Sequence, residues 1–513
     1  MNRVASPGRV ARRRRARRGR HHRHSGVVLI WFALLLVVLF GMLGLVVDGG
    51  LLMAGHRQAQ NAADAAALAA AMDKMHGRTN AQATATATEF VQDHNGLVAA
   101  PAPVVNIPPV HGPYAGMPDY VEVIVTSPSR TFFVHILPGV APDQQVRARA
   151  VAGFEAVSAG EGVAVLDPHA RPGLAVTGGG ILKVLGQVIV NSEGGGEDQF
   201  GVKLDAQQTA ATASNNSTFL ATRVHVVGGV NDRTNFYDYH NPTNPEGYKD
   251  VLYCRQSPIP DPLMSLPTPT TGNGVLDVNR DSVSVLNNNV HLPDEPESDH
   301  LGRQNEQIGD TVYIYPGIYR SIQINSGKVV FAPGIYVLSP KSQTSTALSI
   351  TGGDVIAEGI MFYNTGNSYS AASGSPDIND EEKPPPGNIS DLDDGTAFFG
   401  GFTINAGMQF SPIDTVNFPV AGLEEDVDIS VFNGMLFYQR RRNARTLSIA
   451  GNAADGQLKG TLYAKWARVD ITGQGTYSAQ FVVGRMSVSG SGNVTLQYAG
   501  ENLGRAPRVF LVE

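Results

Sequence analysis

Few acidic or basic side chains in this sequence are placed as polysaccharide-cleaving chemistry requires. Such chemistry needs two carboxylates close together on one face of the fold, or a carboxylate beside a base. Asp310 precedes a turn-rich segment, where an acid typically caps a turn, and Asp354 and Glu358 flank a strand-like VIAEG segment and are expected to face solvent. The arginine run 440–442 could hold an anionic glycan, although charge runs are typical of solvated faces. We therefore expect no catalytic residues, with a polysaccharide lyase or hydrolase as the rival hypothesis.

One segment has part of the spacing of a calcium-binding loop. Asp277, Asn279 and Asp281 occupy the first, third and fifth positions of an EF-type loop. Ser282 stands where the turn glycine belongs, and Asn288 stands where the bidentate glutamate belongs. The pattern is therefore incomplete, and we expect no metal and no cofactor.

Three further motif classes are weak or absent. Residues 375–395 are acidic and proline-rich, which predicts a surface loop whose Asp391, Asp393 and Asp394 calcium could order. The histidines are scattered, and His21, His22 and His24 extend a basic patch. No Gly-x-x-x-x-Gly-Lys loop is present, so the sequence does not indicate the ATPase of a secretion machine.

The element that must position everything else is an apolar segment near the N-terminus. No charged residue occurs from Val27 to Val47, and a helix of about 20 residues spans the ~30 Å hydrocarbon core of a bilayer. A secretory signal has a shorter apolar region of about 7–15 residues and a small-residue cleavage site, which this segment lacks. We therefore predict a permanent transmembrane helix over residues 26–48, with anchor residues Val27, Trp31, Phe32, Phe40 and Val47.

The basic N-terminal tail, residues 1–25, predicts the orientation of that helix. It carries ten arginines and no acid, and because the whole chain has a formal charge of −7, the remainder carries −17. Positive charge next to a membrane helix stays on the cytoplasmic side. We expect the N-terminus inside and the rest in the periplasm or outside the cell. A nucleic-acid-binding tail is the alternative, but a tethered basic tail lies closer to anionic lipid, so we expect no nucleic-acid partner.

Composition predicts an exported, turn-rich protein. Cys254 is the single cysteine, which excludes an intramolecular disulfide. The chain has 57 glycines and 31 prolines but only 17% charged residues, a composition that favours short strands and many turns over helical bundles.

The segment after the anchor is predicted to be helical because it is rich in alanine and contains no proline. Small residues recur every three or four positions and form one face: Ala59, Ala62, Ala63, Ala66, Ala67 and Ala70. Such a face allows another backbone to approach closely, so it could be an assembly surface. Packing against its own domain is the alternative, and spacing alone leaves both open.

A small sheet is predicted after this helix. A polar stretch and a proline-rich connector lead to three alternating segments, residues 120–126, 130–137 and 146–157, which predict three strands. A membrane helix that continues into a long helix and is followed by a small sheet has the layout of a pilin-like subunit.

Residues 26–71 resemble the N-terminal region of Tad pilus-assembly proteins of the TadE/TadG type. The most specific elements are Asp48-Gly49 and the QNAADAAA segment from Gln60, and the similarity extends through TFFVHILPG and VRARAVAGF to about residue 155. The resemblance implies a single-pass, envelope-facing protein that assembles or stabilises Flp-type pili. The assembly-helix residues that it implicates are Asp48, Gly49, Asn61, Ala62, Asp64 and Ala66.

Two features depart from related patterns. The fifth residue after Gly26 is Trp31 and not glutamate, so the motif for prepilin cleavage is incomplete. No Asp-x-Ser-x-Ser pentapeptide is present, so the metal-dependent adhesion module of larger TadG-like proteins is not indicated.

From about residue 160 the sequence changes to short apolar strands separated by glycine and asparagine. Residues 315–319, Tyr-Pro-Gly-Ile-Tyr, return as Ala-Pro-Gly-Ile-Tyr at residues 332–336. Short strands at near-even spacing favour a stacked β-solenoid, and the texture resembles right-handed β-helix proteins of the pectin-lyase type. A β-sandwich is the alternative.

Taken together, the sequence predicts a membrane helix with a small α+β pilin-like unit over residues 49–155, followed by an all-β region over residues 160–513. We expect a non-catalytic component of Flp/Tad-type pilus assembly or of a related adhesive structure in the cell envelope. The expected partners are the membrane, other envelope proteins, and an extracellular glycan or surface. A membrane-tethered polysaccharide-binding or polysaccharide-processing protein and a scaffold at the pilus base are the alternatives. The sequence does not indicate an oligomeric state.

Overall fold

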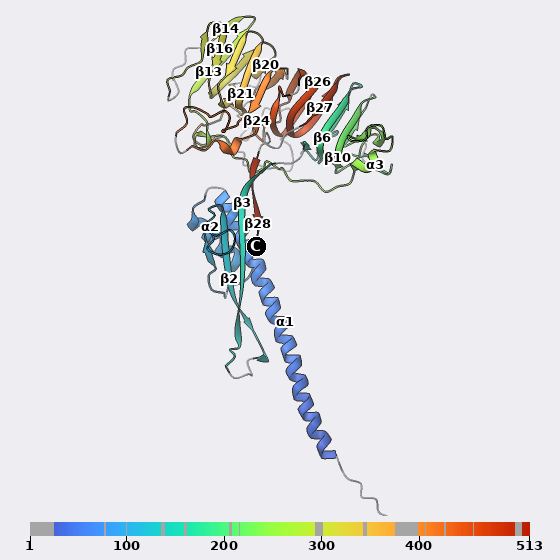
Figure 1. The fold of residues 1–513 in the computed structure, drawn as a ribbon, viewed down its shortest axis with the longest axis vertical. Helices are drawn as coiled ribbons and strands as arrows, with labels where there is room; N and C mark the ends of the chain where they lie inside the picture. Colours follow the sequence, from blue (N-terminus) through green and yellow to red (C-terminus); the bar gives the residue numbers. More distant parts are fainter. Residues whose placement is uncertain are drawn as a thin grey trace, which may run out of the picture. The chain divides into compact units, whose positions relative to one another are not determined.

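A computed structural model of the chain describes residues 25–75, 78–98, 100–134, 139–158, 162–204, 208–214, 216–292, 301–341, 346–374, 399–405, 407–424, 427–454, 456–497 and 505–512 (Figure 1). The chain divides into an N-terminal unit, Met1–Phe154 with Val509–Glu513, and a solenoid unit, Glu155–Arg508. The basic tail with its three histidines, and the acidic segment 375–395 with its aspartates, lie outside the described residues. The all-β region predicted over residues 160–513 therefore does not include the last few residues, which return to the N-terminal unit.

The N-terminal unit combines three helical segments with a four-stranded sheet in the order β1-β2-β3-β28. Its elements are α1 (Ser25–Met75), α2 (Asn80–Glu89), the π-helical turn η1 (Phe90–His94), β1 (Val104–Asn106), β2 (Tyr120–Arg130), β3 (Asp143–Ser158) and β28 (Arg505–Leu511). Strands β2 and β3 form a long antiparallel hairpin whose register runs from Tyr120 opposite Gly153 to Arg130 opposite Asp143. The pairing of β28 with β3 brings the C-terminal strand into this sheet.

This unit contains one helix that was not predicted, and one predicted strand needs correction. The polar stretch after α1 contains α2, which begins with a capping box in which Thr79 and Gln82 satisfy each other's backbone N–H groups. The strand predicted over residues 130–137 does not form in its described part. Residues 131–134 belong to the loop between β2 and β3, because the carboxylate of Asp48 accepts the backbone N–H groups of residues 132–134.

The solenoid unit is built from strands that pair mainly in parallel. Its strands are β4 (Val163–Val165), β5 (Leu174–Thr177), β6 (Ile181–Val190), β7 (Gly196–Glu197), β8 (Lys203–Leu204), β9 (Ala211–Ala213), β10 (Thr218–Val226), β11 (Phe236–Asp238), β12 (Leu252–Tyr253), β13 (Asn279–Leu286), β14 (Asn289–His291), β15 (Glu306–Ile308), β16 (Thr311–Ile314), β17 (Gly317–Ile324), β18 (Lys328–Phe331), β19 (Gly334–Leu338), β20 (Thr346–Ile350), β21 (Asp354–Asn364), β22 (Gly401–Asn405), β23 (Gln409–Pro412), β24 (Met435–Gln439), β25 (Leu447–Ala453), β26 (Lys459–Ser489) and β27 (Asn493–Leu496). Its helical turns are α3 (Tyr248–Val251), η3 (Arg233–Asn235), η4 (Thr271–Asn273) and η5 (Ser430–Phe432).

Successive parallel pairings make a solenoid-like stack. Along one face the order is β13, β17, β20, β22, β25 and β26, each pair in parallel register. Along another face β16, β18, β21 and β23 pair in the same way. An immunoglobulin-like β-sandwich is made of antiparallel sheets, so these registers do not fit the sandwich alternative.

The coils do not stack in chain order. The last coils of the chain, within β26 and β27, pair with β4, β5 and β6, the first strands of the unit. Figure 1 shows this order as red strands beside teal ones, with the yellow-green strands at one end of the stack and β10 and α3 at the other. The chain therefore enters and leaves the stack at neighbouring coils in its interior.

A connector, residues 254–278, returns along the stack from one end to the other. The Asn191 side chain donates to the Ile259 carbonyl at 2.8 Å and accepts from the Ile259 N–H at 3.0 Å. The Tyr369 hydroxyl donates to the Pro269 carbonyl at 2.9 Å. Leu263, Leu266 and Val275 of the connector pack in a core cluster with the tyrosines of β21, β24 and β26. The connector thus covers a second apolar face of the stack.

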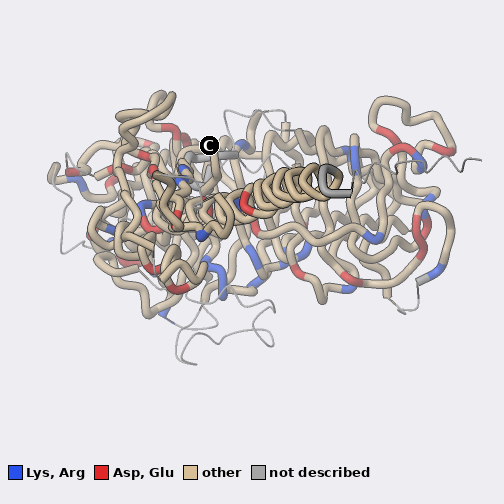
Figure 2. Tube along the Cα trace, turned by 90° about the horizontal axis from the view of Figure 1, so that it is seen from below, with Lys and Arg blue, Asp and Glu red and all other residues tan. Residues whose placement is uncertain are grey.

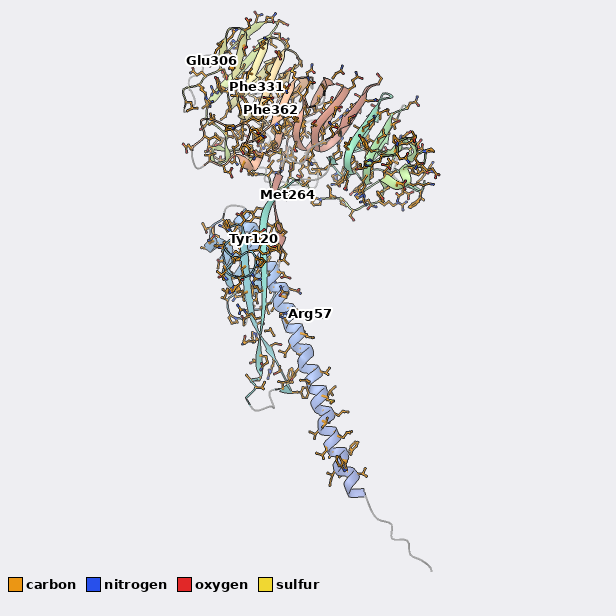
Figure 3. All side chains as sticks on the ribbon, viewed as in Figure 1. Arg57, Tyr120, Met264, Glu306, Phe331 and Phe362 are labelled. Atoms are coloured by element: carbon orange, nitrogen blue, oxygen red, sulfur yellow. The ribbon has the colours of Figure 1, made fainter. Side chains whose placement is uncertain are left out.

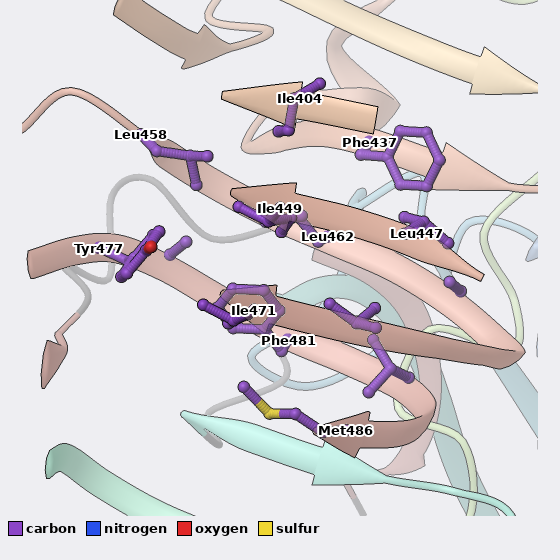
Figure 4. Close-up of a cluster of buried hydrophobic side chains, with 14 of the residues drawn as sticks. Ile404, Phe437, Leu447, Ile449, Leu458, Leu462, Ile471, Tyr477, Phe481 and Met486 are labelled. Carbon is purple, nitrogen blue, oxygen red and sulfur yellow. The ribbon is translucent and has the colours of Figure 1, made fainter. Parts of the chain in front are cut away.

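Aliphatic and aromatic side chains repeat at equivalent positions of successive coils. Ile324, Ile350, Ile404, Ile449 and Ile471 are register partners in turn and are all buried. Figure 4 shows part of this ladder, with Ile404, Ile449 and Ile471 on neighbouring strands. Because each coil contributes apolar side chains at matching positions, the core is continuous along the stack.

The repeated Pro-Gly-Ile-Tyr segments have one structural device in common. Tyr319 donates its hydroxyl to the carbonyl of Tyr315, and Tyr336 donates to the carbonyl of Ala332. In each copy the tyrosine therefore closes the preceding Pro-Gly turn, whose glycine has a positive φ of 153° at Gly317 and 141° at Gly334. The repeat observed in the sequence corresponds to one type of corner in the stack.

Candidate functional site

The N-terminal half of α1 exposes a continuous apolar surface. Among the described residues one helix, α1, is long and apolar enough to cross a membrane, and its apolar part is almost entirely exposed. The predicted anchor residues Trp31, Phe32, Phe40 and Val47 are all exposed, and the side chain of Val27 lies outside the described residues. Figure 2 draws this half of α1 as an almost uninterrupted tan coil, without Lys, Arg, Asp or Glu. Such a surface is stable only against lipid or another apolar partner.

Asp48 ends the predicted span, yet its side chain is completely buried. Its carboxylate accepts backbone N–H groups from the β2–β3 loop: Phe132 at 2.9 Å, Phe133 at 2.8 Å and Val134 at 2.6 Å. Hydrogen bonds to an ionised carboxylate are about twice as strong as neutral ones. Asp48 therefore fixes the loop to the helix.

Two glycines of α1 allow the hairpin to approach this closely. A Cβ atom on Gly44 would come within 2.6 Å of Cβ of Phe133, and one on Gly55 would come within 2.9 Å of Oγ of Ser129. Each is closer than non-bonded atoms tolerate, so a larger residue at either position would displace the hairpin. Gly49 has nothing within 4 Å of such a Cβ, so the glycine of the Asp48-Gly49 pair is not required by packing in the described structure.

The alanine face of α1 packs within its own unit. Ala59, Ala62, Ala63, Ala66, Ala67, Ala70 and Ala71 are completely buried in one core cluster with side chains of α2, β2 and β3. Small side chains allow the sheet to lie close to the helix axis. Of the two alternatives left open by the sequence, the packing alternative therefore describes this face, and Ala62 and Ala66 are not available to a partner in this fold.

The remaining assembly-helix residues have different roles. Asn61 is exposed. Asp64 accepts a hydrogen bond of 2.7 Å from the Gln60 side chain, which also donates to the Arg149 carbonyl at 3.0 Å. Gln60 therefore connects α1 with β3, and Asn61 keeps an exposed surface.

A buried glutamate that sequence reasoning missed organises the far end of the sheet. Burial alone would raise the pKa of Glu122, but hydrogen bonds from Arg149, Asn106, the Val110 N–H and His111 lower its pKa to about 2. The closest of these contacts joins Arg149 Nε to Glu122 Oε1 at 2.5 Å. A single glutamate within an alternating strand gave no signal, because its partners come from β1, from the loop after β1 and from β3.

The acidic candidates for catalysis lie along one face of the stack: Asp310 directly precedes β16, and Asp354 begins β21, two parallel pairings away. Asp310 is exposed in the turn that joins β15 to β16. Asp354 is exposed at the start of β21, and Glu358 is half-buried four residues later.

The arginine run does not form a solvated face, which corrects the prediction for residues 440–442. Arg440 and Arg441 are buried. Arg441 Nη2 donates to three connector carbonyls, those of Leu263 at 3.0 Å, Met264 at 2.7 Å and Leu266 at 2.9 Å. Its Nε donates to the Tyr463 hydroxyl at 2.8 Å. Because these donors are occupied inside the protein, Arg441 holds the connector and is not available to a glycan.

The incomplete calcium pattern does not form a loop. Asn279, Asp281 and Ser282 lie in strand β13, where Asp281 forms an ion pair of 2.9 Å with Arg320. Asn288 lies between β13 and β14. Among the described residues no group of three or more His, Cys, Asp and Glu side chains is arranged to hold a metal ion.

A pocket of about 610 Å³ opens on the surface of the stack over β6, β10 and β11. It is lined by Ile181, Lys183, Thr218, Leu220, Tyr237, Tyr239, Pro242, Thr243 and Pro245. The volume is within the range of small-molecule sites, which combine apolar or aromatic walls with a few polar groups. Sequence analysis did not identify this pocket, because it joins three strands with a loop of ordinary composition.

Comparison with known proteins concerns the N-terminal region. Residues 26–73 match the family model described as putative Flp pilus-assembly TadE/G-like. No curated protein and no solved structure matches the chain. The matched residues coincide with almost all of α1, from the apolar half through Asp48 to the alanine face. The N-terminal region of this chain is therefore TadE/G-like.

Proposed function

We propose that this protein is a non-catalytic, membrane-anchored component of Flp/Tad-type pilus assembly or of a related adhesive surface structure. The observation that carries the proposal is the coincidence of the TadE/G-like match with a helix whose first half is apolar and exposed. This is the arrangement expected of a single-pass anchor that continues directly into an assembly unit.

The proposed orientation places the N-terminus in the cytoplasm and both units on the other side of the membrane. Ten arginines precede the apolar segment, and positive charge of this kind is retained on the cytoplasmic side. The role proposed for the solenoid unit is binding by an extended surface. We further propose that its coils are right-handed, because crossovers between parallel strands almost always are.

The experiment is a gene deletion followed by complementation. Surface fibres, counted by electron microscopy, are expected to disappear on deletion and to return with the wild-type chain. A chain with Leu35→Arg and Val38→Arg should not restore them, because each arginine at the centre of a membrane helix costs about 2.5–3.5 kcal/mol on insertion scales. The control chain has Val98→Arg and Val110→Arg, at two exposed positions outside the span. Unchanged fibres in the deletion strain would contradict the proposal.

The pocket over β6, β10 and β11 supports a second candidate function, glycan binding. Tyr237 and Tyr239 offer aromatic surface for a sugar ring, Thr218 and Thr243 offer hydroxyl groups, and Lys183 would favour an anionic sugar. This function is compatible with either an adhesive part or a membrane-tethered polysaccharide-binding protein.

Glycan-array binding by the full chain tests this second function. Tyr237→Ala should abolish binding, and Lys183→Gln should weaken binding of anionic glycans more than that of neutral ones. Phe200→Ala is the matched control, because Phe200 is an exposed aromatic residue of the same unit outside the pocket. Equal binding by all variants would exclude the pocket as the site.

A further inference from the structure

The loop between β2 and β3 presents apolar side chains at the end of a long hairpin. From Thr131 to Pro142 the sequence has no Asp, Glu, Lys or Arg. Of the described residues in this loop, Phe132 is 53% exposed and Phe133 is 42% exposed. Two adjacent, half-exposed phenylalanines are unfavourable in water, because moving one such side chain from water into an apolar environment gains about 1.5–3 kcal/mol of free energy.

This tip lies beside the membrane-spanning part of α1. The Phe133 side chain packs directly against Gly44, three residues before the end of the apolar segment at Val47. At 1.5 Å per residue, Phe133 is about 5 Å closer to the membrane centre than Val47. Phe133 is therefore level with the apolar segment of α1.

The backbone N–H groups of residues 131–134 find partners within the protein. Asp48 accepts the N–H groups of Phe132, Phe133 and Val134, and the Thr131 N–H donates to the Pro142 carbonyl at 2.8 Å. In a bilayer, backbone polar groups must find partners inside the protein, because no water is present to accept them. The same contacts hide the Asp48 carboxylate, the only charged group of α1 between Val28 and Met53.

On the hairpin the charged residues begin at the base of the loop, where the Arg130 guanidinium lies 5.7 Å from the centre of the Phe132 ring. The last charged rung of the hairpin is Arg130 opposite Asp143, next to Ser129, whose hydroxyl donates to the Leu51 carbonyl at 3.4 Å. On the helix, the exposed apolar residues continue to Met53, and the first exposed charged residue is Arg57 (Figure 3). From Val28 to Met53 the exposed apolar part of α1 measures about 39 Å, more than the ~30 Å hydrocarbon core needs.

We propose that residues 131–134 are immersed in the lipid bilayer beside α1, so that Phe132 and Phe133 contact acyl chains. The outer surface of this bilayer then lies near Met53 instead of Asp48. The inference rests on the membrane anchoring proposed above. The hairpin then holds the sheet of the N-terminal unit against the membrane at two points, the helix and the loop. Asp48 has the role of a buried backbone partner that makes immersion of the loop possible.

Depth measurement by spin labelling tests this proposal in the full chain, reconstituted in phospholipid vesicles. A nitroxide is attached to Phe132→Cys in a Cys254→Ala background, and its collisions with oxygen, which enters the bilayer, are compared with those with a water-soluble nickel chelate. Two control positions are Val37→Cys in the middle of the span and Met117→Cys, an exposed residue before the opposite end of β2. The oxygen-to-nickel collision ratio at position 132 is expected to be several-fold higher than at position 117 and to approach that at position 37.

Two results would overturn the proposal, and the second would also contradict the proposed membrane anchor. If position 37 reports hydrocarbon while position 132 is as accessible to nickel as position 117, the anchor stands and the immersed tip does not. If position 37 is itself accessible to nickel, the helix is not in the bilayer, and both the tip and the proposed anchor fall. The label replaces a half-exposed side chain. Folding is checked independently in an otherwise identical chain that retains Cys254, whose buried thiol should stay protected from a thiol reagent.

Discussion

Replacing Asp48 should release the loop that it holds. In the wild-type chain one carboxylate oxygen accepts the Phe132 N–H and the other accepts those of Phe133 and Val134, at 2.6–2.9 Å. Asp48→Asn keeps the size but replaces one acceptor oxygen by a donor, so at least one N–H loses its partner. Asp48→Ala removes all three. With about 1.5–3 kcal/mol for each hydrogen bond to a charged group, we expect a loss of roughly 2–3 kcal/mol for Asn and about 4 kcal/mol or more for Ala.

Amide hydrogen exchange of the full chain in detergent micelles measures this loss. A loss of 2 kcal/mol in the free energy of local opening corresponds to roughly 30-fold faster exchange. The amides of residues 132–134 should therefore exchange at least that much faster in Asp48→Asn, and faster still in Asp48→Ala. Asp93→Asn is the control, because Asp93 is exposed elsewhere in the same unit. Unchanged exchange in Asp48→Ala would refute the role given to this carboxylate.

Three further outcomes follow from buried groups. Because the pKa of Glu122 is lowered to about 2, its ion pairs stabilise the N-terminal unit above the ordinary pKa of about 4.5, and this stability is lost as the pH falls from about 5 to about 2. After solvent screening, we expect this loss of stability to be ~1–2 kcal/mol. It should appear as faster amide hydrogen exchange at low pH, and this acceleration should be absent in Glu122→Gln. Arg441→Met should lower the free energy of unfolding of the solenoid unit by about 3–5 kcal/mol in denaturant titrations, because three connector carbonyls lose their donor, whereas the exposed Arg468→Met should cost less than about 1 kcal/mol. Burial raises the pKa of Cys254 to about 12, so this thiol should react with a maleimide only after denaturation; labelling of the native chain at the rate of an exposed thiol would contradict its placement.

The sequence was most informative where periodicity and length decide the structure. The apolar segment, the alanine-rich helix and the strand-and-glycine texture of the outer region each follow from local composition, and the structure contains all three. Prediction was poorer where a distant residue decides. Residues 130–134 alternate like a strand. However, Asp48, more than 80 positions earlier, accepts the N–H groups of residues 132–134, which are therefore not free to pair with a neighbouring strand.

Long-range contacts also explain the remaining differences. The arginine run has the composition of a solvated face, but Arg441 is buried because carbonyl groups of the connector accept its hydrogen bonds. The stacking of the last coils on β4–β6 depends on pairings over more than 300 residues, which no local pattern encodes. In contrast, the start of α2 is indicated by a local motif, the Thr79–Gln82 capping box. The alternation of threonine and alanine that follows does not indicate an apolar helix face.

The proposed anchor has a cytoplasmic N-terminus and carries both units on the other side of the membrane. Protease accessibility of a chain tagged at each end, compared in intact cells and in spheroplasts, tests it most directly. We predict that the C-terminal tag is digested only after the outer envelope is opened, whereas the N-terminal tag survives in both. Loss of the N-terminal tag, with a mature chain that begins near Val27, would contradict a permanent anchor and would instead indicate a processed subunit that enters the fibre.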